Sequence, residues 1–463
     1  MFSSSELIYE DWSDEIGYSL PALMSILALV ILVGISCVNE DLNVGFLGIA
    51  FGIIVGGVFG GTPATKIMNA FPLSLFMILV GVTFLFGMAQ TNGTMEKLTA
   101  YSIRVCKGNT ALIPIIIFLL SDFLTTIGPG NIAGCALMAP VAMAIAGRVK
   151  MPAFLMTLLV VGACNAAAFS PFAPTGIISN GIIAKVAPDL GIPADQLDAI
   201  AWMVYFKSTL AQGFVTVVGF MVMGGAKWLK EQRGASLDID ELAPKPEPFN
   251  AAQTTTLLMV ALLVLLVVVP GLPGIKGTLP KMLTNMLSNV GSISFVLSIV
   301  LMLTGYGDSK AAVKVMPWSV IMMVCGVSVL IDVMDKSGGL NFLVQIMSSV
   351  AGPTTICFWA SFVPAVLSAY SSSSGVIMPM FLPMTPGLVE LTGGDAISII
   401  SAINVGSHLV DTSPLSTLGA LCIAAAPEYE DKGVLFRKLL IWGLSMSIVS
   451  GIVCFVFFGV LGL

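Results

Sequence analysis

Residues 72–98, PLSLFMILVGVTFLFGMAQTNGTMEKL, align without a gap with residues 317–343, PWSVIMMVCGVSVLIDVMDKSGGLNFL, at an offset of 245 residues. Eight positions are identical, and they include proline, serine and glycine positions. A second match, at an offset of 243, places residues 170–176, SPFAPTG, on residues 413–419, SPLSTLG. Both of these segments interrupt apolar sequence. The chain therefore consists of two homologous halves whose helices break at equivalent positions.

The composition is that of an all-α polytopic membrane protein. Hydrophobic residues make up 57% of the 463 residues and charged residues 10%, whereas a soluble domain carries roughly 25% charge. Apolar runs of about 20 residues, enough to cross a bilayer core of roughly 30 Å, recur along the chain. The sequence has no Gly-rich phosphate loop and no long soluble domain, which argues against an ATP-driven pump in one chain and against an enzyme.

Ten transmembrane spans are predicted, five in each half. An acidic tail, residues 1–17, precedes the first repeat, residues 18–226, and a charged linker, residues 227–250, separates it from the second repeat, residues 251–463. The predicted spans are residues 18–38, 43–60, 71–90, 153–187 and 201–226, followed by 251–270, 287–305, 316–334, 396–426 and 439–461.

Each half also contains a segment that is apolar at both ends and polar in the middle. In residues 109–147 the middle reads TTIGPGN, and in residues 352–388 it reads SSSSG. Lys107 and Arg148 flank the first segment, which places both of its ends on the cytoplasmic side. Because irregular backbone at membrane depth must line a cavity, we expect two re-entrant helical hairpins rather than further complete spans.

The basic residues set the predicted orientation. With the N-terminus outside and the spans threaded alternately, fourteen of the 20 Lys and Arg residues lie inside. Cytoplasmic loops of membrane proteins carry such an excess. This threading starts the first half outside and the second half inside. The repeats are then inverted, and one hairpin enters from each face.

Four helix breaks are predicted within the membrane, two at hairpin tips and two in interrupted spans. Unpaired backbone groups are costly in lipid, and converging breaks can satisfy them by binding an anion at helix N-termini and a cation at freed carbonyls. This arrangement is typical of secondary transporters. Simpler explanations exist: Ser371–Ser374 could be small-residue helix packing, the Ser-Pro pairs proline kinks, and Asn131 a helix cap.

His408 is the only histidine of the chain and lies one turn before Asp411 in an apolar stretch. Ionisable residues within a span are functional candidates. Asp411 could coordinate a cation, or share a proton with His408, a residue type whose unperturbed pKa of about 6.5 suits proton exchange. Alternatively, a His–Asp hydrogen bond could serve only to hold the broken helix. We expect Asp122 and Asp332 near the membrane ends of their helices.

Three stretches resemble the malonate/dicarboxylate carrier (MatC-like) family. They are LVGVTFLFGMAQTNGTMEKL at residues 79–98, TTIGPGNIAGCALMAPVAM at 125–143 and LVVGACNAAAFSPFAPTGIISNGII at 159–183. The resemblance is strong over about residues 20–190 and depends on the repeat beyond them. In architecture the chain resembles the divalent-anion/sodium symporters of the ion transporter superfamily. This implies a homodimer in which a transport domain carries both hairpins across the membrane, as an elevator, against a fixed scaffold.

The hairpin tips of the divalent-anion symporters bear Ser-Asn-Thr, which contacts substrate carboxylates and sodium. Here one tip reads GPGN and the other SSSS, so only Asn131 and the serines can take over those contacts. The resemblance implies the substrate-binding residues Gly128, Pro129, Gly130, Asn131, Ser170, Pro171, Thr175, Ser371, Ser372, Ser373, Ser374, Ser413, Pro414 and Thr417. The predicted ion-coupling residues are Asn131, Ser374, His408 and Asp411, with a Na⁺ site near Asn131 and Ser374.

Together these observations predict a secondary active transporter, not an enzyme, that moves small carboxylate anions by symport with Na⁺ or H⁺. C3 or C4 dicarboxylates such as malonate or succinate are the expected substrates. We expect no cofactor and no nucleic acid. The expected partners are the substrate, the lipid bilayer and a second copy of the chain, in the cytoplasmic (inner) membrane of a bacterium.

Two other functions remain open. One is a cation/proton antiporter of the same superfamily with Asp411 as the exchanged carboxylate, although the repeat equivalent of Asp411 is Ala168. The other is the membrane subunit of a binding-protein-dependent carboxylate transporter.

Overall fold

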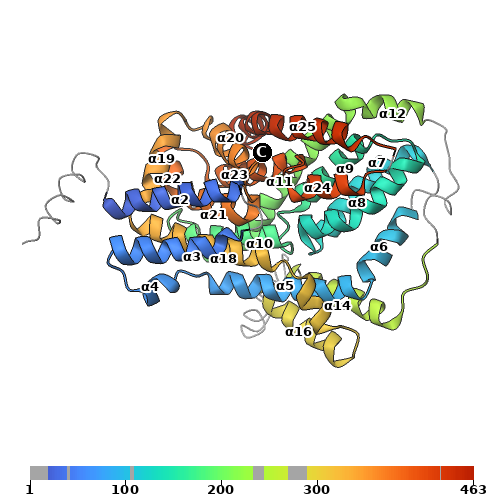
Figure 1. Ribbon diagram of the computed structural model, residues 1–463, viewed down its shortest axis with the longest axis horizontal. Helices are drawn as coiled ribbons and strands as arrows, with labels where there is room; N and C mark the ends of the chain where they lie inside the picture. Colours follow the sequence, from blue (N-terminus) through green and yellow to red (C-terminus); the bar gives the residue numbers. More distant parts are fainter. Residues whose placement is uncertain (1–18, 39–41, 105–108, 233–244, 269–288, 428) are drawn as a thin grey trace, which may run out of the picture.

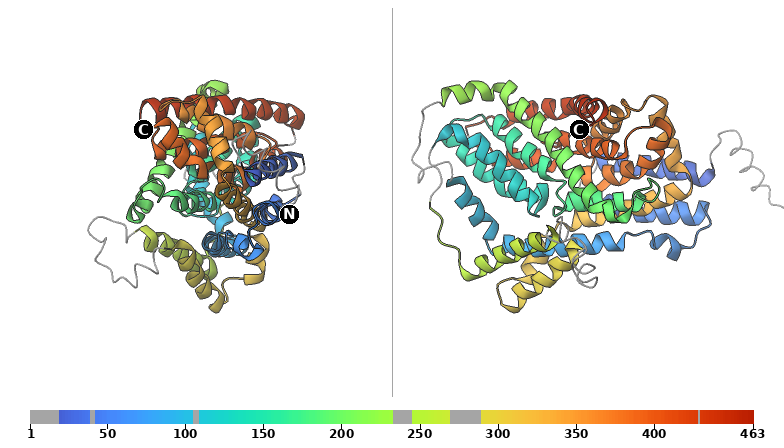
Figure 2. Two further views of the ribbon diagram at one scale, coloured as in Figure 1. Left: turned by 90° about the vertical axis from the view of Figure 1, so that its left-hand side faces the viewer. Right: turned by 180° about the vertical axis from the view of Figure 1, so that it is seen from behind.

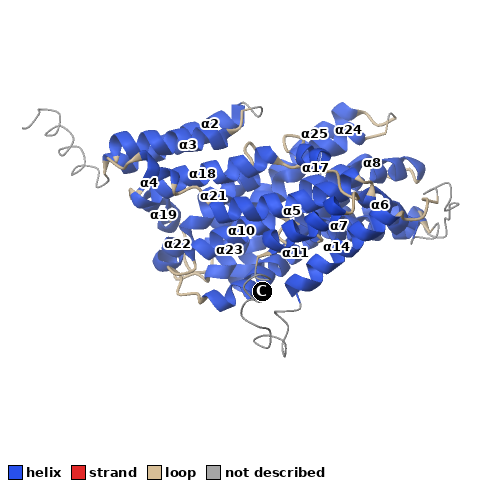
Figure 3. Cartoon of the chain, turned by 90° about the horizontal axis from the view of Figure 1, so that it is seen from below, coloured by secondary structure: helices blue, strands red, loops and turns tan. Residues whose placement is uncertain are grey.

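A computed structural model describes residues 19–38, 42–104, 109–232, 245–268, 289–427 and 429–463. Within these residues the chain forms helices and no β-strand (Figure 3). The acidic tail and half of the predicted linker, residues 233–244, lie outside the described residues. The prediction of an all-helical membrane protein is confirmed.

Residues 20–231 form the first group of helices, and the interrupted span is divided between α9 and α10. The helices of this group are α2 (Leu20–Val38), α3 (Val44–Ile54) with η1 (Val55–Phe59), α4 (Ala64–Met68), α5 (Leu73–Thr91), α6 (Thr94–Ile103), η3 (Thr110–Leu112), α7 (Ile113–Thr126), α8 (Gly130–Arg148), α9 (Ala153–Ala167), α10 (Pro174–Val186), η4 (Ala194–Gln196), α11 (Leu197–Phe220), η5 (Met221–Gly225) and α12 (Ala226–Glu231).

The helices of the second half repeat this order. They are α14 (Ala251–Val268), α16 (Val290–Leu303), α17 (Ser309–Val315), α18 (Trp318–Lys336), α19 (Gly339–Ser349), α20 (Ile356–Ser368), η7 (Ser373–Ile377), α21 (Met378–Phe381), η8 (Leu382–Met384), α22 (Thr385–Thr392), α23 (Ala396–Leu409), η9 (Val410–Thr412), α24 (Thr417–Ala425), α25 (Lys432–Cys454) and η10 (Phe455–Val460).

Several element ends differ from the prediction, and three of them have a clear local reason. The last span begins at Lys432 rather than at 439, because the Asp431 side chain accepts hydrogen bonds from the first backbone N–H groups of α25. The second hairpin continues to Thr392, where Gly393 ends it in a left-handed conformation. The linker starts later than predicted, because a further helix, α12, follows α11 after a kink at Gly224 (φ 121°) and buries Trp228.

Glycines bring helices of one half against helices of the other. A Cβ atom on Gly45 of α3 or on Gly326 of α18 would overlap the backbone of the facing helix. In the same way α5 packs against α16, where a Cβ on Gly81 would overlap Gly291. Small residues allow such close approach in lipid. Since Gly81 and Gly326 are equivalent in the repeat, the two halves pack on each other through the same contact used twice.

Among the described residues, six helices are long and apolar enough to cross a membrane: Leu73–Thr91, Gly130–Arg148, Ala194–Glu231, Trp318–Lys336, Ser373–Thr392 and Lys432–Val460. Seven shorter apolar helices accompany them. The protein is therefore an integral, multi-pass membrane protein. Most of the helices run along the long axis of the molecule (Figure 1).

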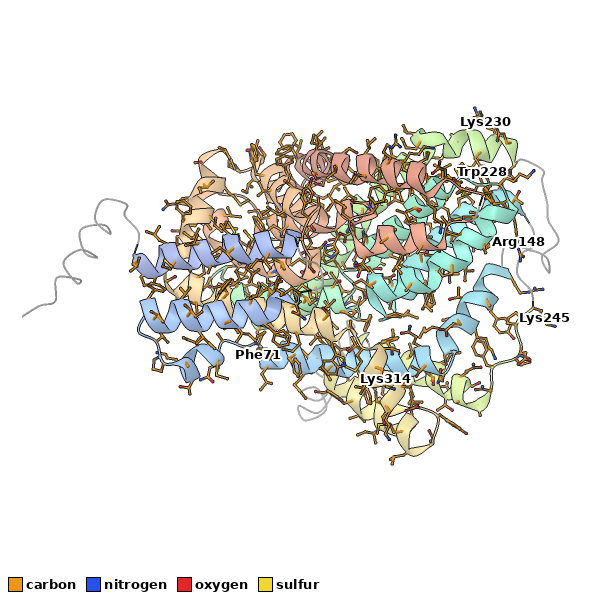
Figure 4. All side chains as sticks on the ribbon, viewed as in Figure 1. Phe71, Arg148, Trp228, Lys230, Lys245 and Lys314 are labelled. Carbon is orange, nitrogen blue, oxygen red and sulfur yellow. The ribbon has the colours of Figure 1, made fainter. Side chains whose placement is uncertain are left out.

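The two ends of this long axis differ. Arg148, Lys230 and Lys245 lie at one end (Figure 4). The pair α7 and α8 also lies toward this end, whereas α19 and α22 lie toward the other (Figure 1), and the right-hand view of Figure 2 agrees with this arrangement. The two helical hairpins thus occupy opposite ends of the molecule.

Candidate substrate and ion site

The two interrupted spans break in the same way. After α9, the backbone N–H of Ser170 donates to the Ala167 carbonyl (3.1 Å), and after α23 that of Ser413 donates to the Val410 carbonyl (2.9 Å). Each serine hydroxyl then accepts a hydrogen bond from the N–H two residues on, at 3.3 Å in the first break and 3.2 Å in the second. The helix is uncoiled at both places, so neither Ser-Pro pair is a simple proline kink.

Glycine shapes the first hairpin tip, which joins α7 to α8. Gly128 and Gly130 have φ angles of 142° and 83°, values that favour glycine. A Cβ on Gly128 would overlap the Phe86 ring, and one on Gly130 would lie 2.8 Å from the ring of Pro174. The tip therefore rests directly on the start of α10. Next to it, the Ser170 hydroxyl donates to the Thr126 carbonyl (2.7 Å) and ties the tip to the first break.

The second tip is built from its serines. The Ser372 side chain accepts a hydrogen bond from the Gly375 N–H (3.1 Å) and starts the returning helical segment. Ser373 is buried, and Ser374 is half-buried beside it. Ser372 thus caps the segment, whereas Ser373 and Ser374 bond to Asp411 and His408 of the second broken span, which excludes mere helix packing for these two.

A chain of hydrogen bonds joins both tips and both breaks. Asn131 donates from Nδ2 to Asn165 Oδ1 (3.1 Å), and Asn165 donates from its own Nδ2 to the His408 carbonyl (2.9 Å). His408 Nε2 lies 3.0 Å from the Ser374 hydroxyl, which lies 3.3 Å from the Thr175 hydroxyl. We call these five residues the central polar chain. It connects α8, α9, α23, the second tip and α10.

An acidic branch leaves the central polar chain at the second tip. Ser373 donates to Asp411 Oδ1 (2.8 Å), and the Ser368 hydroxyl donates to Ser373 (2.7 Å). Asp411 is 5% exposed. A buried carboxylate with one hydroxyl donor on this oxygen can hold a proton or a cation.

His408 does not bond to Asp411, contrary to the proton-sharing and helix-holding hypotheses. Its two ring nitrogens lie 3.0 Å from the hydroxyls of Ser407 and Ser374, and its ring packs edge-on against Phe169. Val410–Thr412 form a 3-10 turn after α23. Asp411 is on this turn rather than on the helix, and its carboxylate meets Ser373 instead.

Three helix N-termini meet at the centre of this arrangement. Gly130 begins α8 against Pro174, which begins α10, and Thr175 of α10 contacts Ser374 at the start of the second returning segment. Helix N-termini carry partial positive charge and free N–H groups. Their convergence favours an anionic ligand at this point.

Other predicted site residues lie outside the central polar chain. Ser413 and Pro414 are buried within the second break, where Ser413 packs against Gly443 of α25, and Thr417 is exposed at the start of α24. Pro129 and Pro171 are half-buried neighbours of Gly130 and Ser170, and Ser371 is half-buried at the second tip.

The two other acidic residues considered from the sequence, Asp122 and Asp332, differ from each other. Asp332 lies near the end of α18, as expected, and pairs with Lys185 (2.8 Å) and Lys336 (2.5 Å). Asp122 lies one turn from the end of α7, close to the first tip rather than to the membrane end. Its Oδ1 atom is buried without a hydrogen-bond partner. The expectation for Asp122 was wrong because α7 is only 14 residues long and ends at the tip.

Sequence reasoning missed Asn165, Ser368 and Ser407. Asn165 is the most central of them, because its side-chain oxygen accepts a hydrogen bond from Asn131 and its side-chain nitrogen donates one to the His408 carbonyl. It occupies the repeat position of His408 at the offset of 243, so comparing the two halves at His408 would have found it. The described residues contain no group of three or more His, Cys, Asp or Glu side chains placed to hold a metal ion.

Residues 20–168 match the family model described as the N-terminus of the dicarboxylate carrier protein MatC. The resemblance to the MatC-like carriers is confirmed. A comparison with curated proteins gave no match. Among solved structures, the chain is similar to the YdaH transporter of Alcanivorax borkumensis, whose crystal structure is described as having an unusual topology. The TM-score is 0.57 at 15% identity, over 95% of this chain and 98% of that one, so the likeness concerns the fold.

Proposed function

We propose that this MatC-like protein is a secondary active transporter, a symporter that carries small carboxylate anions together with Na⁺ or H⁺. C3 and C4 dicarboxylates such as malonate and succinate are the proposed substrates. The central polar chain carries this proposal, because it joins two hairpin tips and two helix breaks from both halves of the protein. The match to the dicarboxylate carrier family supports the choice of substrate.

The substrate is proposed to bind where the N-termini of α8, α10 and the segment beginning at Ser373 meet. No arginine lies within an apolar span, so the carboxylates would be met by backbone N–H groups and by the side chains of Asn131, Thr175 and Ser374. Such a site suits an anion that must leave again, since dipoles and hydroxyls bind less tightly than buried cationic side chains.

Movement is proposed to follow an elevator mechanism in a homodimer. The moving part would contain the two hairpins and the two broken spans, and the glycine-packed helices α3, α5, α16 and α18 would belong to the scaffold. Ten spans and two inverted repeats, with the N-terminus outside, fit the segregation of Arg148, Lys230 and Lys245 to one end of the molecule (Figure 4). The cytoplasmic membrane of a bacterium is the proposed location.

Uptake into proteoliposomes tests this function. Labelled malonate, succinate and citrate are offered with an inward sodium gradient, with an inward proton gradient, and with neither. We expect gradient-driven accumulation of at least one dicarboxylate. The variant Ser374→Ala should lower uptake at least about tenfold, whereas Ser349→Ala, at an exposed serine that bonds locally within α19, should leave it unchanged. Failure of every dicarboxylate would refute the proposal.

A cation/proton antiporter is the second candidate, and the buried Ser373–Asp411 contact favours it. A single carboxylate can alternate between a proton and a cation. In that case the proteoliposomes would show sodium-driven proton efflux without any carboxylate, and Asp411→Asn would abolish it.

A further inference from the structure

A small cavity lies beside the central polar chain and is bordered by Asn165. It measures about 10 Å³, which is space for one water-sized particle. α9, α11, α25 and the turn after α23 enclose it. Its polar lining residues are Asn165, Gln212, Thr216 and Thr412, and Trp442 also borders it.

Gln212 of α11 has an oxygen that nothing in the described protein satisfies. The residue is fully buried. Its Nε2 donates to the Asn165 carbonyl (3.1 Å), and because a carbonyl can only accept, this contact fixes which end of the amide is nitrogen. The remaining Oε1 is buried without a hydrogen-bond partner. Since buried acceptors are almost always paired, this oxygen indicates an occupant of the cavity.

The cavity also lies at the C-terminal end of a helix. α23 ends at Leu409, and the 3-10 turn Val410–Thr412 follows it; Leu409 and Thr412 both line the cavity. The C-terminal end of a helix carries partial negative charge, which favours a cation. An amide oxygen, a hydroxyl and a helix end form a hard oxygen environment, and the small volume admits an ion of water size but excludes a carboxylate.

We propose that this cavity is a sodium site with Gln212 Oε1 as its principal side-chain ligand and the Thr412 hydroxyl as a second. It is separate from the predicted sodium position at Asn131 and Ser374. Asn165 bonds to Gln212 through its carbonyl and to Asn131 and His408 through its side chain. Sodium here therefore fixes the residue that links both hairpin tips. This coupling role rests on the proposed function, whereas sodium binding itself does not.

Sodium-dependent thermal stability of the purified protein in detergent tests the site. The melting temperature is measured across NaCl concentrations, with KCl or choline chloride keeping the ionic strength constant. Wild type should gain stability from sodium specifically. Gln212→Leu should raise the sodium concentration for half of this gain at least about tenfold or abolish the gain. Gln212→Glu, which supplies a carboxylate oxygen, should shift the same concentration about tenfold downward.

Gln253→Leu is the matched control. Gln253 is also buried, but its amide bonds to the backbone of Asn92 and Asn250, so the variant should lose stability and keep the sodium response. Equal gains from sodium and potassium in wild type, or an unchanged sodium response in both Gln212 variants, would overturn the site and leave it a water position. If the wild-type protein is stabilised by sodium as expected but takes up no carboxylate in proteoliposomes, the sodium site stands and the proposed function is contradicted.

Discussion

The two tip-to-break contacts of this protein have the same geometry and different chemistry. In the first half Asn131 bonds to Asn165 at 3.1 Å, and in the second half Ser374 bonds to His408 at 3.0 Å. Asn131 is equivalent to Ser374, and Asn165 to His408, at the repeat offset of 243. The repeat has therefore kept a tip-to-break hydrogen bond in both halves, with neutral amides in one and an imidazole in the other.

The acidic branch also differs between the two halves, because only the second half contains it. Ser373 bonds to Asp411 in the second half, and the equivalent positions in the first half are Gly130 and Ala168. Glycine at 130 allows close contact with Pro174, which a side chain would prevent. The first half thus uses its tip for backbone approach, and the second half uses its tip to hold an ionisable group. Ion coupling by protons or cations is expected to depend mainly on the second half.

The largest effect, on stability, is expected at the two helix breaks, where the two halves are most alike. A Cβ on Gly176 would overlap the Ser170 carbonyl oxygen, and one on Gly419 would overlap that of Ser413. Gly176→Ala and Gly419→Ala should each destabilise the protein by about 3 kcal/mol, because backbone atoms cannot move aside as a side chain does. Thermal unfolding in detergent measures this. Gly34→Ala, with open space around it, is the control, and a large difference between the two break variants would disprove their equivalence.

Asp411→Asn should give the next largest effect, on uptake rather than on folding. Asparagine retains the shape and a hydrogen bond from Ser373 but cannot bind a proton or balance a cation. Gradient-driven uptake should fall by about 10- to 100-fold. Asp308→Asn, at an exposed helix cap where Asn serves as well as Asp, is the control. Uptake that stays within twofold of wild type would show that the acidic branch is structural.

The sequence predicted the all-helical, multi-pass class of the fold, because apolar runs can be located without knowing any long-range contact. The glycines at both breaks and the polar tips could be located from the offset alone. The contacts between tips and breaks could not, because residues such as Ser374 and Thr175 are far apart in sequence and meet only after packing. The direction in which the Asp411 side chain points also depends on a 3-10 turn that the local sequence does not specify.

A smaller and more selective effect is expected when the second half is made to resemble the first. In His408→Asn, the new amide can still bond to the Ser374 hydroxyl, so uptake should stay within about tenfold of wild type. If His408 carries the coupling proton, the dependence of uptake on pH between about 5 and 8 should disappear. The measurement is initial uptake in proteoliposomes at fixed sodium across this range. An unchanged pH profile would assign proton coupling elsewhere, with Asp411 of the acidic branch as the remaining ionisable group near the second tip.

The smallest effect is expected at an ion pair that joins the two halves near the membrane surface. Lys185 of α10 bonds to Asp332 of α18 at 2.8 Å, and the lysine side chain is 57% exposed. Exposed pairs contribute little, so Lys185→Ala should cost less than about 1 kcal/mol of stability. In the proposed elevator this pair connects the moving part to the scaffold and must separate in each cycle. A double-mutant cycle with Asp332→Ala, read out by both melting temperature and uptake rate, isolates the contribution of the Lys185–Asp332 pair.

Lys336→Ala, which removes the other partner of Asp332 within α18 itself, is the control. Lys185→Ala should change the uptake rate by about two- to threefold and Lys336→Ala should not, because only the first contact crosses between the parts proposed to move.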